Sequence, residues 1–172
     1  VLAAPSVKNR YYRRVFHQIV DYMVDFVHIV RGKDEIVILA DSATLPYFTG
    51  RVPNGVLIEA NIEDIWIRDF SPVMPSRQIK FRYLPSYHHK SVGRLIDSSF
   101  ERWLVENNLN YKRKSNIILD GGNVVDNPNG TRVIITDRLL RDNPWFSKEE
   151  AKRQLKRTMG VHQVAIIPEL PG

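Results

Sequence analysis

The 172-residue sequence predicts a mixed α/β (α+β) fold in which helices alternate with short strands. Long segments repeat apolar residues at spacings of three and four, which is typical of one face of a helix. Short apolar runs rich in Val and Ile lie between them and indicate buried strands. One pair of such runs flanks an Asn-Gly turn and predicts a hairpin, so we do not expect a purely parallel sheet.

Three segments have the pattern of amphipathic helices. Residues 11–30 place their apolar side chains on one face, and Gly32 follows where a C-terminal cap belongs. Residues 91–107 repeat this pattern. The motif at residues 147–150, Ser-Lys-Glu-Glu, has the form of a capping box and predicts a third helix, which ends at Gly160.

The predicted strands are short and interleaved with these helices. They cover residues 35–40, 56–59, 79–83, 117–119, 124–126, 131–136 and 164–167. Residues 124–126 and 131–136 form the two arms of the predicted hairpin, because the Asn-Gly pair between them tolerates positive φ.

The composition is that of an ordinary soluble globular domain, with 43% hydrophobic and 26% charged residues. The sequence contains no cysteine, which excludes disulfides, thiolate metal sites and a cysteine nucleophile within these residues. There is neither a run of 18 apolar residues nor a charged leader with a cleavage site, so we expect no membrane partner and a cytoplasmic location.

The charge balance is moderately basic, with 25 Lys and Arg against 19 Asp and Glu. The basic residues are scattered, and the longest run, at 112–114, is short, which favours a solvated surface over a nucleic-acid partner. A small basic nucleic-acid-binding module remains an alternative, in which Lys112 to Lys114 would act with the aromatic residues Tyr83 and Tyr87.

Residues 63–70 concentrate acidic side chains, one arginine and one tryptophan after an apolar strand. If this segment is extended, Asp64, Trp66 and Arg68 share one side, and Asp69 lies among apolar side chains on the other. A carboxylate in that position is costly unless it meets a cation, such as one on a ligand. The alternative is a structural pair between Arg68 and Asp64.

Residues 120–123, Asp-Gly-Gly-Asn, follow another apolar strand. Paired glycines let the backbone approach a ligand closely, although a tight turn between two strands explains them equally well. The motif lacks the Gly-Lys-Ser ending of a phosphate loop, and a hairpin strand rather than a helix follows it, which excludes a dinucleotide fingerprint.

The adjacent histidines His88 and His89 do not form a convincing metal motif. Adjacent side chains of an extended segment point apart, and no partner follows at a ligand spacing, so a surface loop is the favoured interpretation and we expect no metal site. No glycine elbow around a serine or other triad signature is present.

Four blocks taken in series resemble a known family. Residues 64–72, Asp-Ile-Trp-Ile-Arg-Asp-Phe-Ser-Pro, are similar to its Asp-x-Trp-x-Arg-Asp-x-Gly-Pro block. Residues 119–123 are similar to its Glu-Gly-Gly-Asn/Ser block, with Asp120 in place of Glu, and residues 139–150 and 167–172 resemble two later blocks. The family is that of the agmatine deiminases and bacterial-type peptidylarginine deiminases, in the guanidine-modifying (pentein) superfamily.

The resemblance implies a fold and a domain organisation. Residues 1–172 would form a single, incomplete pentein-type deiminase domain, the N-terminal portion of a five-module α/β propeller. Its ββαβ-type modules would number roughly three of the five.

The resemblance also implies a reaction and a site. The family hydrolyses a guanidinium group to a ureido product and ammonia through a cysteine thiouronium intermediate, with a histidine to handle protons and no cofactor. Asp69 would bind the guanidinium, and Trp66 would line the pocket. A neighbouring wall would come from Gly121, Gly122 and Asn123, and loop support from Asp64, Arg68 and Asp120.

The family's cysteine and its Gly-His-x-Asp block are not found among these residues, so we expect the chain alone to be inactive. The expected partners are a guanidinium small molecule or an arginine side chain, together with a second copy or the missing C-terminal portion. A natural pseudoenzyme is a further alternative. Agmatine, free arginine and peptidyl-arginine all stay open as substrates.

Overall fold

The computed structural model describes residues 1–170, which fall into two compact units. The first comprises residues 1–67 and 98–107, and the second comprises residues 68–97 and the chain from residue 108 onward. The helix α3 (Lys90–Glu106) runs across this division. Each unit is described by itself.

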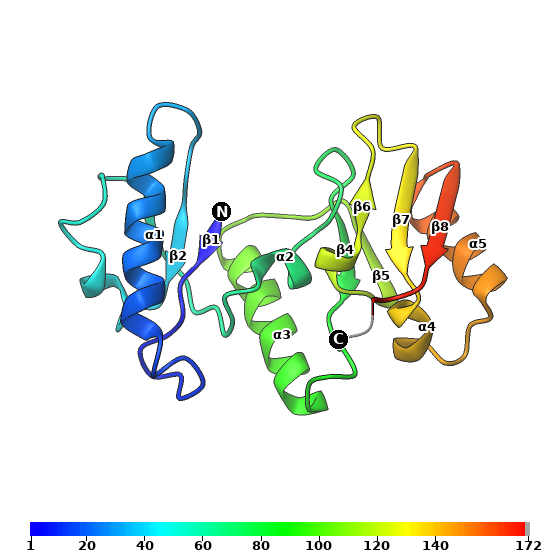
Figure 1. Cartoon of the computed structure of the whole chain (residues 1–172), viewed down its shortest axis with the longest axis horizontal. Coiled ribbons are helices and arrows are strands. Elements are labelled where there is room, and N and C mark those ends of the chain that lie inside the picture. Colours follow the sequence, from blue (N-terminus) through cyan, green and yellow to red (C-terminus); the bar gives the residue numbers. More distant parts are fainter. Residues whose placement is uncertain (171–172) are drawn as a thin grey trace. The chain divides into compact units, whose positions relative to one another are not determined.

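The first unit is built on a small parallel sheet in the order β1-β2-β3. Its strands are β1 (Leu2–Ala3), β2 (Ile38–Ala40) and β3 (Leu57–Glu59). The helix α1 (Phe16–Val30) lies beside β2 (Figure 1) and buries its apolar stripe against the sheet. The core of this unit consists of Ala4, Phe16, Val20, Met23, Val24, Val27, Ile38, Ala40 and Phe48.

The helix α1 begins at Phe16, not at residue 11 as the periodicity predicts. The preceding residues fold as turns because the side chain of Asn9 accepts the N–H of Tyr11, and Val15 N–H bonds the carbonyl of Tyr12. A side chain that bonds the nearby backbone offers an alternative to the helix. The positive φ of Gly32, 78°, agrees with its expected place just beyond the helix.

The second unit contains two sheets. The strands β4 (Ile79–Arg82) and β5 (Arg113–Ile118) pair in parallel. The other sheet has the order β6-β7-β8, with β6 (Val125–Asp126), β7 (Arg132–Thr136) and β8 (Gln163–Ile167). Antiparallel pairing of β6 with β7 confirms the predicted hairpin, whereas β7 and β8 run in parallel.

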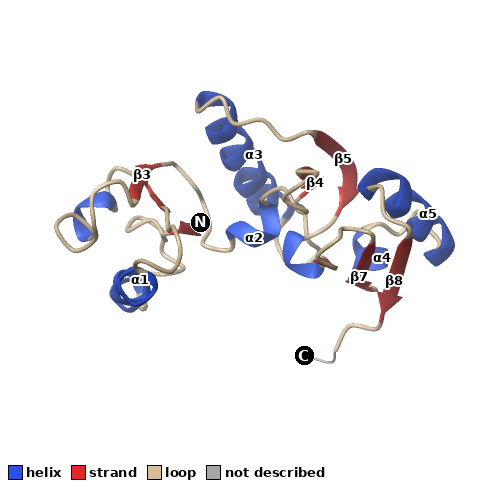
Figure 2. Cartoon of the chain, turned by 90° about the horizontal axis from the view of Figure 1, so that it is seen from above, coloured by secondary structure: helices blue, strands red, loops and turns tan. Residues whose placement is uncertain are grey.

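The helix α5 (Lys148–Met159) covers one face of the β6-β7-β8 sheet and lies beside β8 (Figure 2). Its N-terminus has the predicted capping box between Ser147 and Glu150, and Gly160 ends it in the left-handed conformation. The core between helix and sheet includes Val133, Ile135, Leu139, Ala151, Leu155, Met159, Val164 and Ile166.

Four short helical turns complete the described chain. They are the helices α2 (Ile67–Phe70) and α4 (Arg138–Asp142) and the 3-10 turns η1 (Leu45–Tyr47) and η2 (Gly121–Asn123). The turn α2 corrects the extended conformation considered for residues 63–70, because Ile67 N–H bonds the carbonyl of Ile65 at 2.8 Å and the chain then coils. The two-residue alternation of side chains therefore does not apply to Asp69.

Within residues 1–170, the structure shows no helix that is both long and apolar enough to cross a membrane.

Candidate functional site

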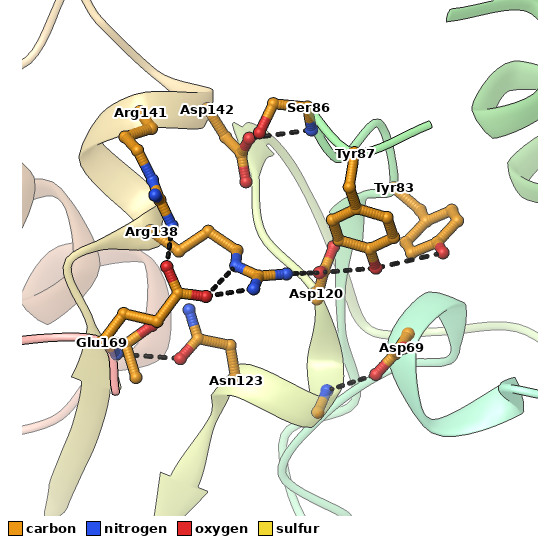
Figure 3. A network of polar contacts seen from close by, with 12 residues as sticks. Asp69, Tyr83, Ser86, Tyr87, Asp120, Asn123, Arg138, Arg141, Asp142 and Glu169 are labelled. Atoms are coloured by element: carbon orange, nitrogen blue, oxygen red, sulfur yellow. Dashed lines mark hydrogen bonds and ion pairs between the residues drawn. The ribbon is translucent and has the colours of Figure 1, made fainter. Parts of the chain in front are cut away.

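A hydrogen bond joins two turns of the second unit that are far apart in sequence. Oδ1 of Asp69, on α2, accepts the backbone N–H of Gly122, in η2, at 3.0 Å (Figure 3). A Cβ atom on Gly122 would lie 2.2 Å from that same oxygen. A Cβ on Gly121 would lie 2.1 Å from the backbone oxygen of Arg68. The paired glycines are therefore required for η2 to approach α2 this closely.

Side chains fix the chain on both sides of this contact. Nη2 of Arg68 donates to the carbonyl of Val124 at 3.0 Å, directly after η2. Oδ1 of Asn123 accepts the N–H of Thr136, at the end of β7, at 2.8 Å. The η2 turn is thus bonded both to α2 and to the β6-β7-β8 sheet.

Asp120 precedes η2 and is the most perturbed acid of the site. It is 6% exposed, and its Oδ2 accepts the hydroxyl of Tyr87 at 2.9 Å. Its other oxygen, Oδ1, is buried and has no hydrogen-bond partner within residues 1–170. One of the two carboxylate oxygens therefore lacks a donor, and a buried acceptor without a donor is costly in free energy.

The surroundings of Asp120 disfavour its charged form. Burial raises the pKa of Asp120 to about 6, and although the Tyr87 hydroxyl and the charge of Arg138 oppose this rise, the charges of Asp69 and Asp142 add to it. The guanidinium of Arg138 lies near Asp120, with its Nη1 4.0 Å from Oδ2 of that residue.

Arg138 bonds mainly to another acid, Glu169. Its Nε donates to Oε1 of Glu169 at 2.7 Å, and its Nη2 bonds the same oxygen. Its guanidinium also lies 5.0 Å from the centre of the Tyr87 ring. A second arginine of α4, Arg141, pairs with the other carboxylate oxygen of Glu169 (Figure 3).

These groups line a cavity of about 680 Å³. Its walls come from the loop after β4, from α4 and from the segment after β8, and they consist of Ser86, Tyr87, Asp137, Arg138, Arg141, Glu169 and Leu170. The loop is fixed because Ser86 N–H bonds Oδ1 of Asp142 at 2.9 Å. A cavity with acids and arginines in its walls is suited to a polar, charged ligand.

The family model of the Porphyromonas-type peptidyl-arginine deiminases matches residues 1–171. The chain belongs to this family. The match confirms the resemblance found in the four sequence blocks.

Solved structures show the same fold. The agmatine deiminase of C. jejuni matches with a TM-score of 0.76 and 19% identity, over 97% of this chain and 51% of that one. Its Cys-to-Ser variant with substrate bound matches with a TM-score of 0.72 and 19% identity, over 97% and 52% of the two chains. The agmatine deiminase of Enterococcus faecalis matches with a TM-score of 0.70 and 16% identity, over 98% and 49%.

The chain therefore spans about half the length of these deiminases. No curated protein matches the sequence. The predicted α/β class is confirmed by the likeness to the agmatine deiminase fold.

Among the residues that the deiminase resemblance singles out, six lie in the second unit, and the contacts above bring them together around η2. They are Arg68, Asp69, Asp120, Gly121, Gly122 and Asn123. The other two, Asp64 and Trp66, belong to the first unit, where Trp66 is 61% exposed.

Asp64 and Arg68 do not form the structural pair considered in the sequence analysis, because each bonds to other residues. Oδ1 of Asp64 accepts the hydroxyl of Tyr12 and, at 2.7 Å, the N–H of Ile65. Burial and the bond to Asp64 raise the pKa of the Tyr12 hydroxyl. Arg68 instead bonds Val124.

Sequence reasoning missed Arg138, Arg141 and Glu169. A signal for them exists, because Arg138 follows β7 and Glu169 follows β8. The carboxyl ends of parallel neighbours meet at one sheet edge, so parallel pairing of β7 with β8 brings the two residues together. No pattern in the sequence indicates that these two strands pair with each other.

The two adjacent histidines take different partners. The ring of His88 lies 4.8 Å from that of Tyr87, whereas Nδ1 of His89 lies 2.7 Å from Oγ of Ser91. Over residues 1–170, the structure groups no three His, Cys, Asp or Glu side chains that could hold a metal ion.

The structure gives the nucleic-acid alternative little support. Tyr83 is buried and cannot stack on a base, and Tyr87 is engaged with Asp120 and Arg138. In the basic run, Lys112 and Arg113 each donate to a backbone carbonyl at 3.1 Å.

Proposed function

We propose that this chain forms the guanidinium-binding part of a deiminase, with Asp69 as the carboxylate that binds the guanidinium group. The substrate would be agmatine, free arginine or the arginine of a peptide. The observation that carries the proposal is the buried carboxylate of Asp120 beside η2, whose Oδ1 has no hydrogen-bond partner within residues 1–170. Burial, together with repulsion from the charges of Asp69 and Asp142, raises the pKa of Asp120. A bound cation would relieve this repulsion.

A guanidinium group suits this setting better than an ammonium group does. It keeps its charge at any useful pH and presents a planar fork of N–H donors that carboxylates accept in bidentate fashion. Oδ1 of Asp120 has no donor within the described residues, so it is an acceptor that an N–H group of a ligand would satisfy.

The other residues named from the resemblance keep supporting roles in this proposal. Gly121, Gly122 and Asn123 form a wall beside the guanidinium, since their backbone approaches α2 directly. The substrate contact of Trp66, a residue of the first unit, stays a prediction from the sequence blocks.

In the deiminase reaction a cysteine thiolate attacks the guanidinium carbon, ammonia leaves, and water hydrolyses the thiouronium to a ureido group and free thiolate. The 172 residues contain no cysteine and cannot supply that nucleophile. We therefore propose that catalysis requires a further protein segment, which a second copy or the remaining portion of a deiminase would provide. This chain alone should release no ammonia from agmatine or arginine, and sustained release would contradict the proposal.

Calorimetric titration of the chain tests guanidinium binding directly. Agmatine, arginine and N-acetylarginine amide are compared with putrescine and citrulline, which lack the guanidinium group. The Asp69→Asn variant should bind agmatine at least tenfold more weakly, because its amide oxygen can still accept the Gly122 N–H but carries no charge.

The matched control is Asp126→Asn, which makes the same chemical change on β6. This variant should bind agmatine like the wild type. Equal affinity for agmatine and putrescine, or equal effects of the two substitutions, would overturn the proposal. The relative affinities of the three guanidinium ligands then decide the substrate class.

A further inference from the structure

Arg138 stands between two carboxylates, with hydrogen bonds to Glu169 and only a long ion pair to Asp120. Its Nε and Nη2 both donate to Oε1 of Glu169, whereas its Nη1 remains 4.0 Å from Oδ2 of Asp120 (Figure 3). Hydrogen bonds of this kind have N···O distances of about 2.7 to 3.2 Å. A movement of roughly 1 Å would therefore turn the long contact with Asp120 into a direct ion pair.

The position of Glu169 is set by the backbone as well as by its side chain. Its N–H donates to Oδ1 of Asp137 at 3.0 Å, and the N–H of Asp137 donates to the carbonyl of Ile167 at 2.8 Å. Arg141 holds the second carboxylate oxygen, Oε2. The backbone bonds do not involve the carboxylate, so Glu169→Gln leaves them in place and is a conservative change.

We infer that Glu169 is a positioning residue of the guanidinium site, because it binds Arg138 and so keeps this internal guanidinium from closing its long ion pair with Asp120 into a hydrogen-bonded one. This inference rests on the proposed function. An arginine of the chain that paired directly with Asp120 would satisfy its acceptors and neutralise its charge. The site would then hold its own guanidinium group and would attract an external one less strongly.

The charge balance around Asp120 agrees with this role. The groups that face Asp120 are the hydroxyl of Tyr87, the guanidinium of Arg138 and the carboxylates of Asp69 and Asp142. Burial and the two neighbouring acids raise the pKa of Asp120 to about 6 in spite of the nearby arginine. A direct pair with Arg138 would instead favour the ionised form and lower that pKa.

The test uses two single variants and their combination: Glu169→Gln, Arg138→Gln and the double variant. The control is Glu149→Gln, which makes the same change in an exposed ion pair with Lys152 on α5. The first readout is the pKa of Asp120, followed by the carboxyl ¹³C chemical shift in the chain without ligand. We expect Glu169→Gln to lower this pKa by about one unit, because an opposite charge at contact distance favours the carboxylate. The double variant should return it to the wild-type value or above.

The second readout is agmatine affinity at pH 7.5. Glu169→Gln should weaken binding about tenfold, and additional removal of the Arg138 charge should restore it, since the competing guanidinium is gone. A purely structural role of Glu169 would weaken binding in the single and double variants alike. An unchanged pKa of Asp120 in Glu169→Gln, or a double variant without recovery, would overturn the inference.

The two readouts separate this inference from the proposed function. If the wild type binds no guanidinium compound, the proposed function fails. The NMR titration still shows in that case whether Glu169 keeps Arg138 from a hydrogen-bonded pair with Asp120.

Discussion

Asp69 and Gly122 are joined by a hydrogen bond of 3.0 Å, from the backbone N–H of the glycine to Oδ1 of the acid. This bond connects α2 to η2, although 53 positions separate the two residues. It places a charged side chain against a backbone that no other residue type could bring so close. The proposed guanidinium site depends on this contact.

The two adjacent glycines should respond differently to substitution by alanine. The new Cβ of Gly121→Ala would meet the backbone oxygen of Arg68 at 2.1 Å, and a backbone cannot easily move away. We expect this variant to lose about 1 to 3 kcal/mol of unfolding free energy in urea denaturation.

Gly122→Ala should instead impair binding more than stability. Its Cβ would meet the end of the Asp69 side chain, which can rotate away and take the carboxylate out of position. We expect a small loss of unfolding free energy and at least a tenfold loss of agmatine affinity. If Gly122→Ala binds agmatine like the wild type, Asp69 does not need the position that the structure shows.

Asp120 should make the stability of the chain depend on pH. Its raised pKa means that the folded chain binds this proton more tightly than the unfolded chain, in which the pKa is near 3.8. Asp120 therefore makes the free energy of unfolding fall as pH rises from about 4 to about 6, by up to about 3 kcal/mol.

The variant Asp120→Asn should remove this dependence, because its amide oxygen still accepts the Tyr87 hydroxyl but does not titrate. Thermal melts between pH 4.5 and 7.5 should show a smaller fall in Tm for the variant than for the wild type. Parallel Tm profiles for the two proteins would contradict the assignment of this titration to Asp120.

The buried ion pair of the second unit should matter more than an exposed one. Lys80 is 0% exposed, and its Nζ donates both to Oδ1 of Asp97 and to the carbonyl of Phe81. The variant Asp97→Ala leaves a buried ammonium group without its carboxylate, at a cost of about 3 to 5 kcal/mol.

The comparison for this prediction is Asp21→Ala, which breaks an exposed pair with Arg51 in the first unit. It should cost less than about 1 kcal/mol, because water screens that pair. Chemical denaturation of both variants measures the difference. Equal losses would mean that the buried pair contributes no more than a surface one.

Features encoded by neighbouring residues could be predicted from the sequence. The capping box at Ser147 and Glu150 and the Asn-Gly hairpin depend on local hydrogen bonds and turn conformations, and the structure has both. The start of α1 was predicted too early because apolar periodicity continues into residues whose side chains and turns compete with the helix.

The polar network of the site could be predicted only in part. The sequence blocks point to Asp69, Asp120 and the paired glycines, but the extended geometry considered for residues 63–70 is replaced at Ile67–Phe70 by a helical turn. The partners Arg138 and Glu169 depend on the parallel pairing of β7 with β8, which no local pattern specifies. Contacts set by tertiary pairing of this kind require the structure.

The most direct test of guanidinium binding is the backbone amide signal of Gly122 in a ¹H–¹⁵N NMR titration. Because this N–H donates to Asp69, it reports on the carboxylate proposed to bind the ligand. Agmatine should shift the Gly122 signal in a saturable manner, whereas putrescine at the same concentrations should not. An unmoved Gly122 signal at saturating agmatine, or an equal shift with putrescine, would contradict guanidinium binding at Asp69.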